Sequence, residues 1–192
     1  MFNVAALPQW ELLYTHIRIK LLKVKEYIKK EIFMAGNNKI ELRKLKDSFF
    51  SDHGDLKEIM KKEENKVRGY GYISCLIEKH HFAIPLRSSI THPYSFVVST
   101  PSEAKGGHQG LDYTKAIIID PSYLGSTFVI PNNQFGRIYR NQEKIIADFS
   151  EYVRIYKEFI STGVLPVEYK NAYSFTTLVN YHEELGLLVK SH

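Results

Sequence analysis

The densest cluster of polar side chains able to carry out a reaction follows an apolar segment in the middle of the chain. It consists of Arg87, Ser88, Ser89, Thr91 and His92. A hydroxyl, a fixed positive charge and an imidazole can together promote phosphoryl transfer without a metal ion. The guanidinium stabilises charge on the phosphate oxygens, and the histidine moves protons near neutral pH. The alternative is a polar turn whose hydroxyls bond the local backbone.

A second polar cluster precedes a strongly apolar segment and contains Asp112, Tyr113 and Lys115. Lys115 can contact a phosphate group, and Asp112 can orient a base or pair with Lys115. An Asp-Tyr pair before a strand is also typical of an ordinary turn. The sequence alone leaves both interpretations open.

Metal and cofactor motifs are absent from the sequence. Cys75 is the single cysteine and lies in an apolar run, so we predict a buried small side chain and neither a nucleophile nor a multi-cysteine metal site. His80 and His81 are adjacent and would face opposite sides of a strand. Neither the phosphate-binding nor the dinucleotide-binding glycine motif occurs. We therefore predict no metal site and no nucleotide cofactor.

The composition favours an RNA partner. The chain has 192 residues, with 26 Lys+Arg against 21 Asp+Glu, 13 Tyr and 11 Phe, which gives a net charge of +5. Tyr70, Tyr72, Tyr94 and Tyr113 all lie near the polar clusters, and single-stranded RNA is held by aromatic stacking along basic grooves. The alternative is that these tyrosines are half-buried packing residues. No apolar run approaches the roughly 20 residues that span a bilayer, and no signal peptide is evident, so we expect a cytoplasmic protein with no membrane contact.

The order of predicted elements indicates an α+β protein. Alternation and β-branched or aromatic enrichment predict strands over residues 70–78, 82–86, 94–99, 116–120 and 127–130. Apolar spacing of three and four predicts helices over residues 10–32, 41–64, 145–160 and 175–188. A loop is predicted over residues 101–110, Pro85 is expected at a sheet edge or near a strand end, and Gly163 is expected to end a helix. We expect a small, mostly antiparallel sheet or barrel with helices around it.

Four blocks of the sequence, residues 68–77, 82–88, 110–116 and 181–186, occur in an order and at a spacing that resemble one protein family. They are similar to the toxins of type III toxin–antitoxin systems, the ToxN/AbiQ group, and particularly to its TenpN-like branch. The resemblance covers roughly residues 40–188. It implies a compact antiparallel β-barrel core of the PemK/MazF kind, decorated with helices.

The resemblance also implies an activity and partners. Such toxins are metal-independent endoribonucleases that need no cofactor and cut cellular or phage single-stranded RNA. They are neutralised by a small pseudoknot RNA antitoxin, with which they form closed toxin–RNA hetero-oligomers, and many block phage growth. The expected reaction is attack of a ribose 2′-oxygen on the adjacent phosphate, which gives a 2′,3′-cyclic phosphate and a 5′-hydroxyl end.

The family's catalytic motif falls on residues 85–88 of this chain, so the resemblance makes Ser88 the first candidate catalytic residue. Better-known members carry a lysine two positions later, where this chain has Ile90. The cationic partner is therefore open among Arg87, His92 and Lys115, which are kept as candidate catalytic residues. Candidate RNA-binding residues are Arg68, Tyr70, Tyr72, Ser89, Asp112 and Tyr113.

The first 33 residues lie outside the resemblance and carry a basic amphipathic pattern. We expect a helical extension over residues 1–36 and an endoribonuclease domain over residues 37–192, and we hypothesise that the extension is not native. Two other functions remain open on the sequence. One is an RNA-binding protein without catalysis, and the other is a membrane-surface or protein-interaction domain that acts through the basic extension.

Overall fold

The computed structural model describes residues 40–60, 71–99 and 106–187. The chain divides into two units, residues 1–38 and residues 39–192, and the described residues all belong to the second. The helix predicted over residues 10–32 therefore lies outside the described residues, as do Arg68 and Tyr70. None of the described helices is both long enough and apolar enough to cross a bilayer.

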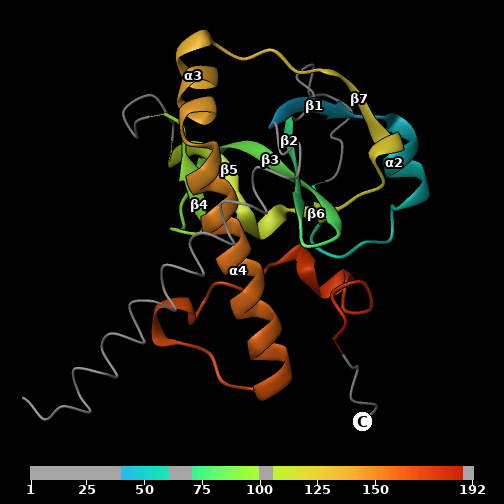
Figure 1. The fold of residues 1–192 in the computed structure, drawn as a ribbon, viewed down its shortest axis with the longest axis vertical. Coiled ribbons are helices and arrows are strands. Elements are labelled where there is room, and N and C mark those ends of the chain that lie inside the picture. Colours follow the sequence, from blue (N-terminus) through green and yellow to red (C-terminus); the bar gives the residue numbers. More distant parts are fainter. Residues whose placement is uncertain (1–39, 61–70, 100–105, 188–192) are drawn as a thin grey trace, which may run out of the picture. The chain divides into compact units, whose positions relative to one another are not determined.

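Seven strands form one antiparallel sheet in the described part of the chain (Figure 1). They are β1 (Glu41–Leu45), β2 (Tyr72–Ile77), β3 (His80–Ile90), β4 (Ser95–Val97), β5 (His108–Asp112), β6 (Ile117–Ile118) and β7 (Leu124–Thr127). The order across the sheet is β4-β5-β3-β2-β1-β7, and β6 pairs with β3. No pairing between described residues joins β7 to β4. The predicted α+β class is thus confirmed. The sheet is not closed, so the expected barrel is not confirmed.

The longest strand, β3, organises this sheet. One of its edges pairs with β2, and the other pairs first with β6 and then with β5. Pro85 lies in the middle of this central strand and not at a sheet edge. The amide of Leu86 donates to the carbonyl of Gly71, so the nitrogen of Pro85 faces the opposite edge. At that edge the β6 pairing has ended at Ala83 and the β5 pairing starts at Leu86, which is why a proline is tolerated here.

In the described residues three α-helices accompany the sheet: α2 (Asp47–Asp52), α3 (Asn132–Arg140) and α4 (Gln142–Thr162). The predicted helix over 145–160 is confirmed as α4, which ends at Gly163 in the left-handed conformation with φ +73°. Its apolar face packs on the sheet, where the ring of Phe149 meets that of Phe82 edge-on at 5.1 Å. The Tyr152 hydroxyl donates to the carbonyl of Ala172 at 2.9 Å, which ties the C-terminal segment to α4.

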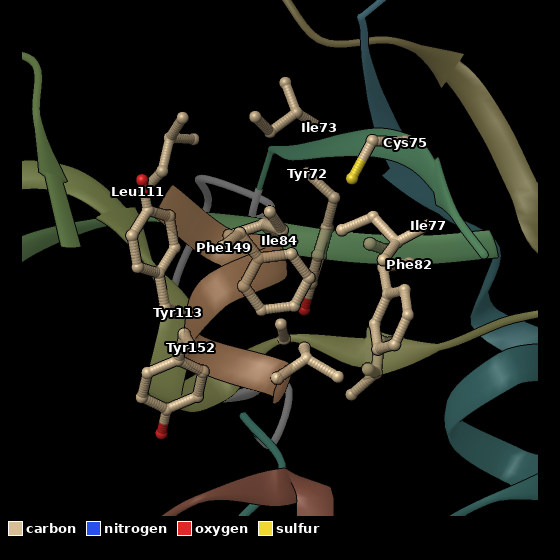
Figure 2. Packing of buried hydrophobic residues seen from close by; sticks show 14 of the residues in the cluster. Tyr72, Ile73, Cys75, Ile77, Phe82, Ile84, Leu111, Tyr113, Phe149 and Tyr152 are labelled. Carbon is tan, nitrogen blue, oxygen red and sulfur yellow. The ribbon is translucent and has the colours of Figure 1, made fainter. Parts of the chain in front are cut away.

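The core lies between α4 and the central strands, and Figure 2 shows how its side chains interlock. Ile84 and Leu111 are completely buried there. Cys75 is 4% exposed, as predicted, and burial raises the pKa of its thiol to about 12. A thiol with so high a pKa stays protonated at neutral pH, so Cys75 acts as a packing group.

Four sequence-based element predictions are wrong. The strand predicted over 127–130 overlaps β7 only at Thr127. The segment at 41–45 is strand β1 and not helix, because pairing with both β2 and β7 outweighs its helix-like spacing. The segment predicted as helix over 175–188 contains only the 3-10 helix Thr177–Asn180 followed by turns. Strand β5 begins within the predicted loop, at His108. The helix α3 was not predicted at all, because Gly136 and its polar neighbours weaken the helical pattern.

Gly110 is expected to tolerate no side chain, because the backbone of β4 crosses close above it. A Cβ at this position would lie 2.4 Å from the carbonyl oxygen of Phe96. We expect Gly110→Ala to lower the free energy of unfolding by about 1–3 kcal/mol, measured by urea denaturation. Gly136→Ala is the control, since its Cβ meets only the mobile end of Arg140 at 3.1 Å. That helical variant should be neutral or stabilised, and equal losses in both variants would contradict the prediction.

Candidate functional site

The polar segment after the second predicted strand forms a bulge in β3. Pairing with β5 is regular up to Arg87 and resumes at Ile90. Between these positions Ser88 and Ser89 stand opposite the single residue Gln109, which is the arrangement of a β-bulge. Ser89 has φ +66°, a left-handed conformation that is uncommon for residues other than glycine. Both serines are exposed, so the bulge lies at the protein surface.

A buried carboxylate, Asp112, holds the cations beside this bulge. Its Oδ2 accepts a hydrogen bond from Nη1 of Arg87, and its Oδ1 lies 3.4 Å from Nε2 of His92. The backbone amide and the hydroxyl of Thr114 donate to Oδ1 at 3.0 and 2.7 Å. Asp112 is fully buried, whereas the side chains of Arg87 and His92 are about one-third exposed. A ligand at the surface can therefore reach the two cations but not the carboxylate.

The charge state of Asp112 follows from these contacts. Burial raises the pKa of the carboxyl, but the hydrogen bond and charge of His92, with the hydrogen bonds of Thr114 and Arg87, outweigh burial. The pKa falls from its ordinary value of 3.8 to about 2. Asp112 is therefore ionised at neutral pH, and its fixed negative charge orients Arg87 and His92.

The strands β4 and β5 add another polar pair on the same face of the sheet. His108, Gly110 and Asp112 alternate along β5 and so share one face, and Ser95 of β4 pairs directly with Asp112. The Ser95 hydroxyl lies 2.7 Å from Nε2 of His108. Neither Ser95 nor His108 was singled out from the sequence. The alternation of polar residues along 108–112 was the available signal, and it was obscured because this segment was assigned to a loop.

His92 sits at the end of a row of stacked aromatic rings. Its imidazole stacks on Tyr94 at 5.9 Å, and Tyr94 stacks on Tyr169 at 5.8 Å. The Tyr94 hydroxyl donates to the carbonyl of Glu168 at 3.0 Å, which fixes the ring. The Nδ1 atom of His92 is buried and has no hydrogen-bond partner. The orientation of His92 is therefore set by Asp112 and Tyr94.

Lys115 does not pair with Asp112, although the sequence allowed that pairing. Its Nζ donates to Oε2 of Glu58 at 2.7 Å and to the carbonyl of Phe175 at 2.8 Å. The ammonium group thus bridges the segment after α2 and the C-terminal segment. Of the three cations considered from the sequence, the structure brings Arg87 and His92 together on Asp112 and gives Lys115 other partners.

Two of the candidate RNA-binding tyrosines lie in the hydrophobic core. Tyr72 is 2% exposed and Tyr113 is 4% exposed, and Figure 2 shows both among core side chains near Phe149. Burial raises the pKa of the Tyr113 hydroxyl. In this conformation neither ring presents a face to solvent on which a base could stack. These two tyrosines are therefore packing residues of the core.

The position where better-known toxins of the resembled group carry a lysine is apolar and buried here. Ile90 is 1% exposed and resumes the β3–β5 pairing opposite His108. A lysine side chain at this position would have to leave the interior. The fixed positive charge beside the bulge is supplied instead by Arg87 from the strand.

Comparison of the chain with protein families, curated proteins and solved structures finds no match. The functional argument therefore rests on the residues. Within residues 40–60, 71–99 and 106–187, no three His, Cys, Asp or Glu side chains gather as a metal site would require. What the site offers is an exposed hydroxyl, a guanidinium and an imidazole, the last two oriented by one buried carboxylate. Such a set can bind a phosphodiester, stabilise added negative charge and move a proton.

Proposed function

We propose that this protein is the toxin of a type III toxin–antitoxin system, a metal-independent, sequence-specific endoribonuclease of single-stranded RNA. The observation that carries the proposal is the geometry around Asp112. This buried carboxylate orients Arg87 and His92 next to the exposed bulge that holds Ser88. The sequence resemblance independently makes Ser88 the catalytic candidate.

In the proposed reaction the 2′-hydroxyl of one ribose attacks the adjacent phosphorus. The new bond from the 2′-oxygen to phosphorus forms as the bond from phosphorus to the 5′-oxygen breaks. The 2′-hydroxyl gives up a proton and the departing 5′-oxygen gains one, so neither water nor a cofactor is consumed. The products are a 2′,3′-cyclic phosphate and a 5′-hydroxyl end.

Each group has a role in this scheme. Ser88 contacts the reacting oxygens, and Arg87 stabilises the negative charge of the five-coordinate phosphorus. One well-placed donor contributes about 2.7–4 kcal/mol to such a transition state. His92 shuttles the proton, and Asp112 is a positioning residue for both cations.

The proposal extends to the fold and the partners. The antiparallel sheet is taken as the counterpart of a PemK/MazF-like barrel core, and the exchange of β6 for β5 along β3 is a break in pairing of the kind that accompanies sheet curvature. The partner is a pseudoknot RNA antitoxin, bound in a closed toxin–RNA assembly, and the biological role is phage defence in the cytoplasm.

The deciding experiment is incubation of the purified full chain with a long single-stranded RNA in EDTA, followed by mapping of the new ends. Discrete cuts with cyclic-phosphate and 5′-hydroxyl ends are expected. Cleavage that requires a divalent metal ion, or that leaves 5′-phosphate ends, would overturn the proposal.

An RNA-binding protein without catalysis is the second candidate. It is favoured by Ile90, which is buried where the resembled toxins carry lysine. Tight RNA binding with no cleavage under the same conditions would support it.

A further inference from the structure

A second basic surface lies away from the bulge, in a groove between β4 and the helices α3 and α4. The groove has a volume of about 580 Å³, and Figure 1 shows β4 and β5 beside these helices. Arg137, Arg140 and Lys144 line it from the helices, and Phe96 and Val98 line it from the sheet. A groove of this size lies within the range of roughly 300–1,000 Å³ that is usual for ligand sites.

The two arginines of the groove have no acidic partner among the described residues. Lys144 is paired with Asp148, whose two oxygens lie 3.0 and 2.8 Å from its Nζ. Neither Arg137 nor Arg140 makes an ion pair with any described carboxylate, and both are exposed. Cations in the last turn of a helix stabilise that helix, but this stabilisation does not require the cations to line a groove. Two unpaired guanidinium groups are well suited to phosphate oxygens.

The sheet side of the groove has the complementary properties. Phe96 and Val98 are 8% and 4% exposed and close the floor of the groove. Ser99 is 6% exposed, and its hydroxyl has no hydrogen-bond partner. The Oε1 atom of Gln134, which also lines the groove, is likewise buried and unpartnered. Both atoms therefore have unused hydrogen-bonding capacity beside the groove.

We propose that this groove is a second RNA site, which binds one or two nucleotides of a single strand. The phosphates contact Arg137 and Arg140, and a base lies in the groove with its polar edge towards Ser99 and Gln134. The proposal deepens the proposed function and rests on it for the identity of the ligand as RNA.

The two sites lie on opposite faces of β4. Successive residues of a strand point to opposite faces, so Ser95 faces Asp112 whereas Phe96 faces the groove. Because β4 is the edge strand in the sheet order, one RNA chain can occupy both sites by passing around it. The side-chain amide of Gln134 donates to Oε1 of Gln109 at 3.0 Å. Gln109 lies opposite the bulge, so this hydrogen bond connects the groove to the candidate site. A short substrate reaches only the bulge.

The test measures binding of a fluorescent 2′-O-methyl RNA of about 20 nucleotides, longer than the roughly 4–16 nucleotides of usual single-strand sites. This RNA lacks the attacking hydroxyl and stays intact whether or not the protein is a nuclease. The full chain carrying R137A/R140A should bind about tenfold more weakly, and the slope of log affinity against log salt should fall by about 1.4. The matched control is K79A/K170A, which removes the same charge from exposed positions outside the groove and should leave affinity nearly unchanged.

The outcomes separate the groove from the proposed function. If R137A/R140A binds the 2′-O-methyl RNA more weakly than wild type does, but wild type does not cut unmodified RNA in EDTA, the groove stands and the nuclease is overturned. If cleavage occurs but both double variants bind like wild type, or weaken equally, the groove proposal fails and the nuclease stands. Dinucleotide cleavage provides a second readout. R137A/R140A should cut a dinucleotide at the wild-type rate while the KM for long RNA rises, and an equal loss on both substrates would overturn the groove.

Discussion

Replacing Ser88 by alanine is expected to lower RNA cleavage in EDTA by about 100-fold or more while the protein remains folded. Loss of a single donor to the reacting oxygens typically costs 10²–10³ in rate, which is the basis of the figure of roughly 100-fold. Ser88 is exposed and lies in a bulge where no regular pairing depends on its side chain. The free energy of unfolding should therefore change by less than about 0.5 kcal/mol. Rates from end-labelled RNA and a urea denaturation curve measure the two quantities.

The control for this variant is Ser126→Ala. Ser126 is also an exposed serine on a strand, but β7 lies at the far end of the sheet order from β4 and β5. It should cut RNA at the wild-type rate. RNA binding should be retained in both variants, because the cations beside the bulge are untouched. Cleavage by Ser88→Ala at the wild-type rate would remove this residue from the mechanism.

Local patterns were sufficient to predict the elements whose stabilising contacts are close in sequence. Alternation from residue 72 onward and a short turn specify the β2–β3 hairpin, in which Tyr72 pairs with Pro85. Spacing of three and four, with Gly163 beyond it, specifies α4. In both cases the local propensity and the tertiary packing agree, so the pattern is a reliable guide.

The remaining elements depend on distant partners. Strand β1 has helix-like apolar spacing and is a strand only because β2 and β7 lie on both sides of it. The short Ile117–Ile118 strand pairs with β3 and not with its chain neighbours. Such pairing is not written in the local sequence, which is why these boundaries could not be predicted.

The composition of the candidate site was predictable, but its organisation was not. The sequence singled out Arg87, His92 and Asp112 as separate polar residues. The β3–β5 register joins Asp112 to Arg87, and the turn after β3 brings in His92. A buried ionised carboxylate at the centre of the site is a consequence of this register, and so is the assignment of Lys115 to a different contact, with Glu58.

Asp112→Asn is expected to affect both stability and catalysis, because the carboxylate holds two cations in place. The amide cannot accept from Arg87 and His92 as a carboxylate does, and its NH₂ group would face a guanidinium. The free energy of unfolding at pH 7 should fall by about 2–3 kcal/mol, measured by urea denaturation. Cleavage should fall about 100-fold, since misplacing a catalytic group by about 1 Å has an effect of that size.

The pH dependence of stability gives this prediction a distinctive signature. The pKa of Asp112 is about 2 in the folded protein against an ordinary value of 3.8, so it is lowered by folding. Its contribution to stability is therefore complete above pH 3.8 and is lost as the pH falls towards 2. Wild type should lose about 2 kcal/mol from this group over that window, and Asp112→Asn should lack that part of the acid destabilisation.

Asp120→Asn is a closely matched control for the positioning role. Asp120 also begins a 3-10 helix and accepts the amide of the residue two positions later, Ser122, at 2.8 Å, as Asp112 accepts that of Thr114 at 3.0 Å. It is exposed and holds no guanidinium or imidazole. If capping alone were the role of Asp112, the two variants would behave alike. A wild-type cleavage rate and an unaltered acid transition in Asp112→Asn would contradict the view that this buried charge organises the site. The opposite result, with Asp120→Asn unaffected, would assign the effect to the contacts with Arg87 and His92.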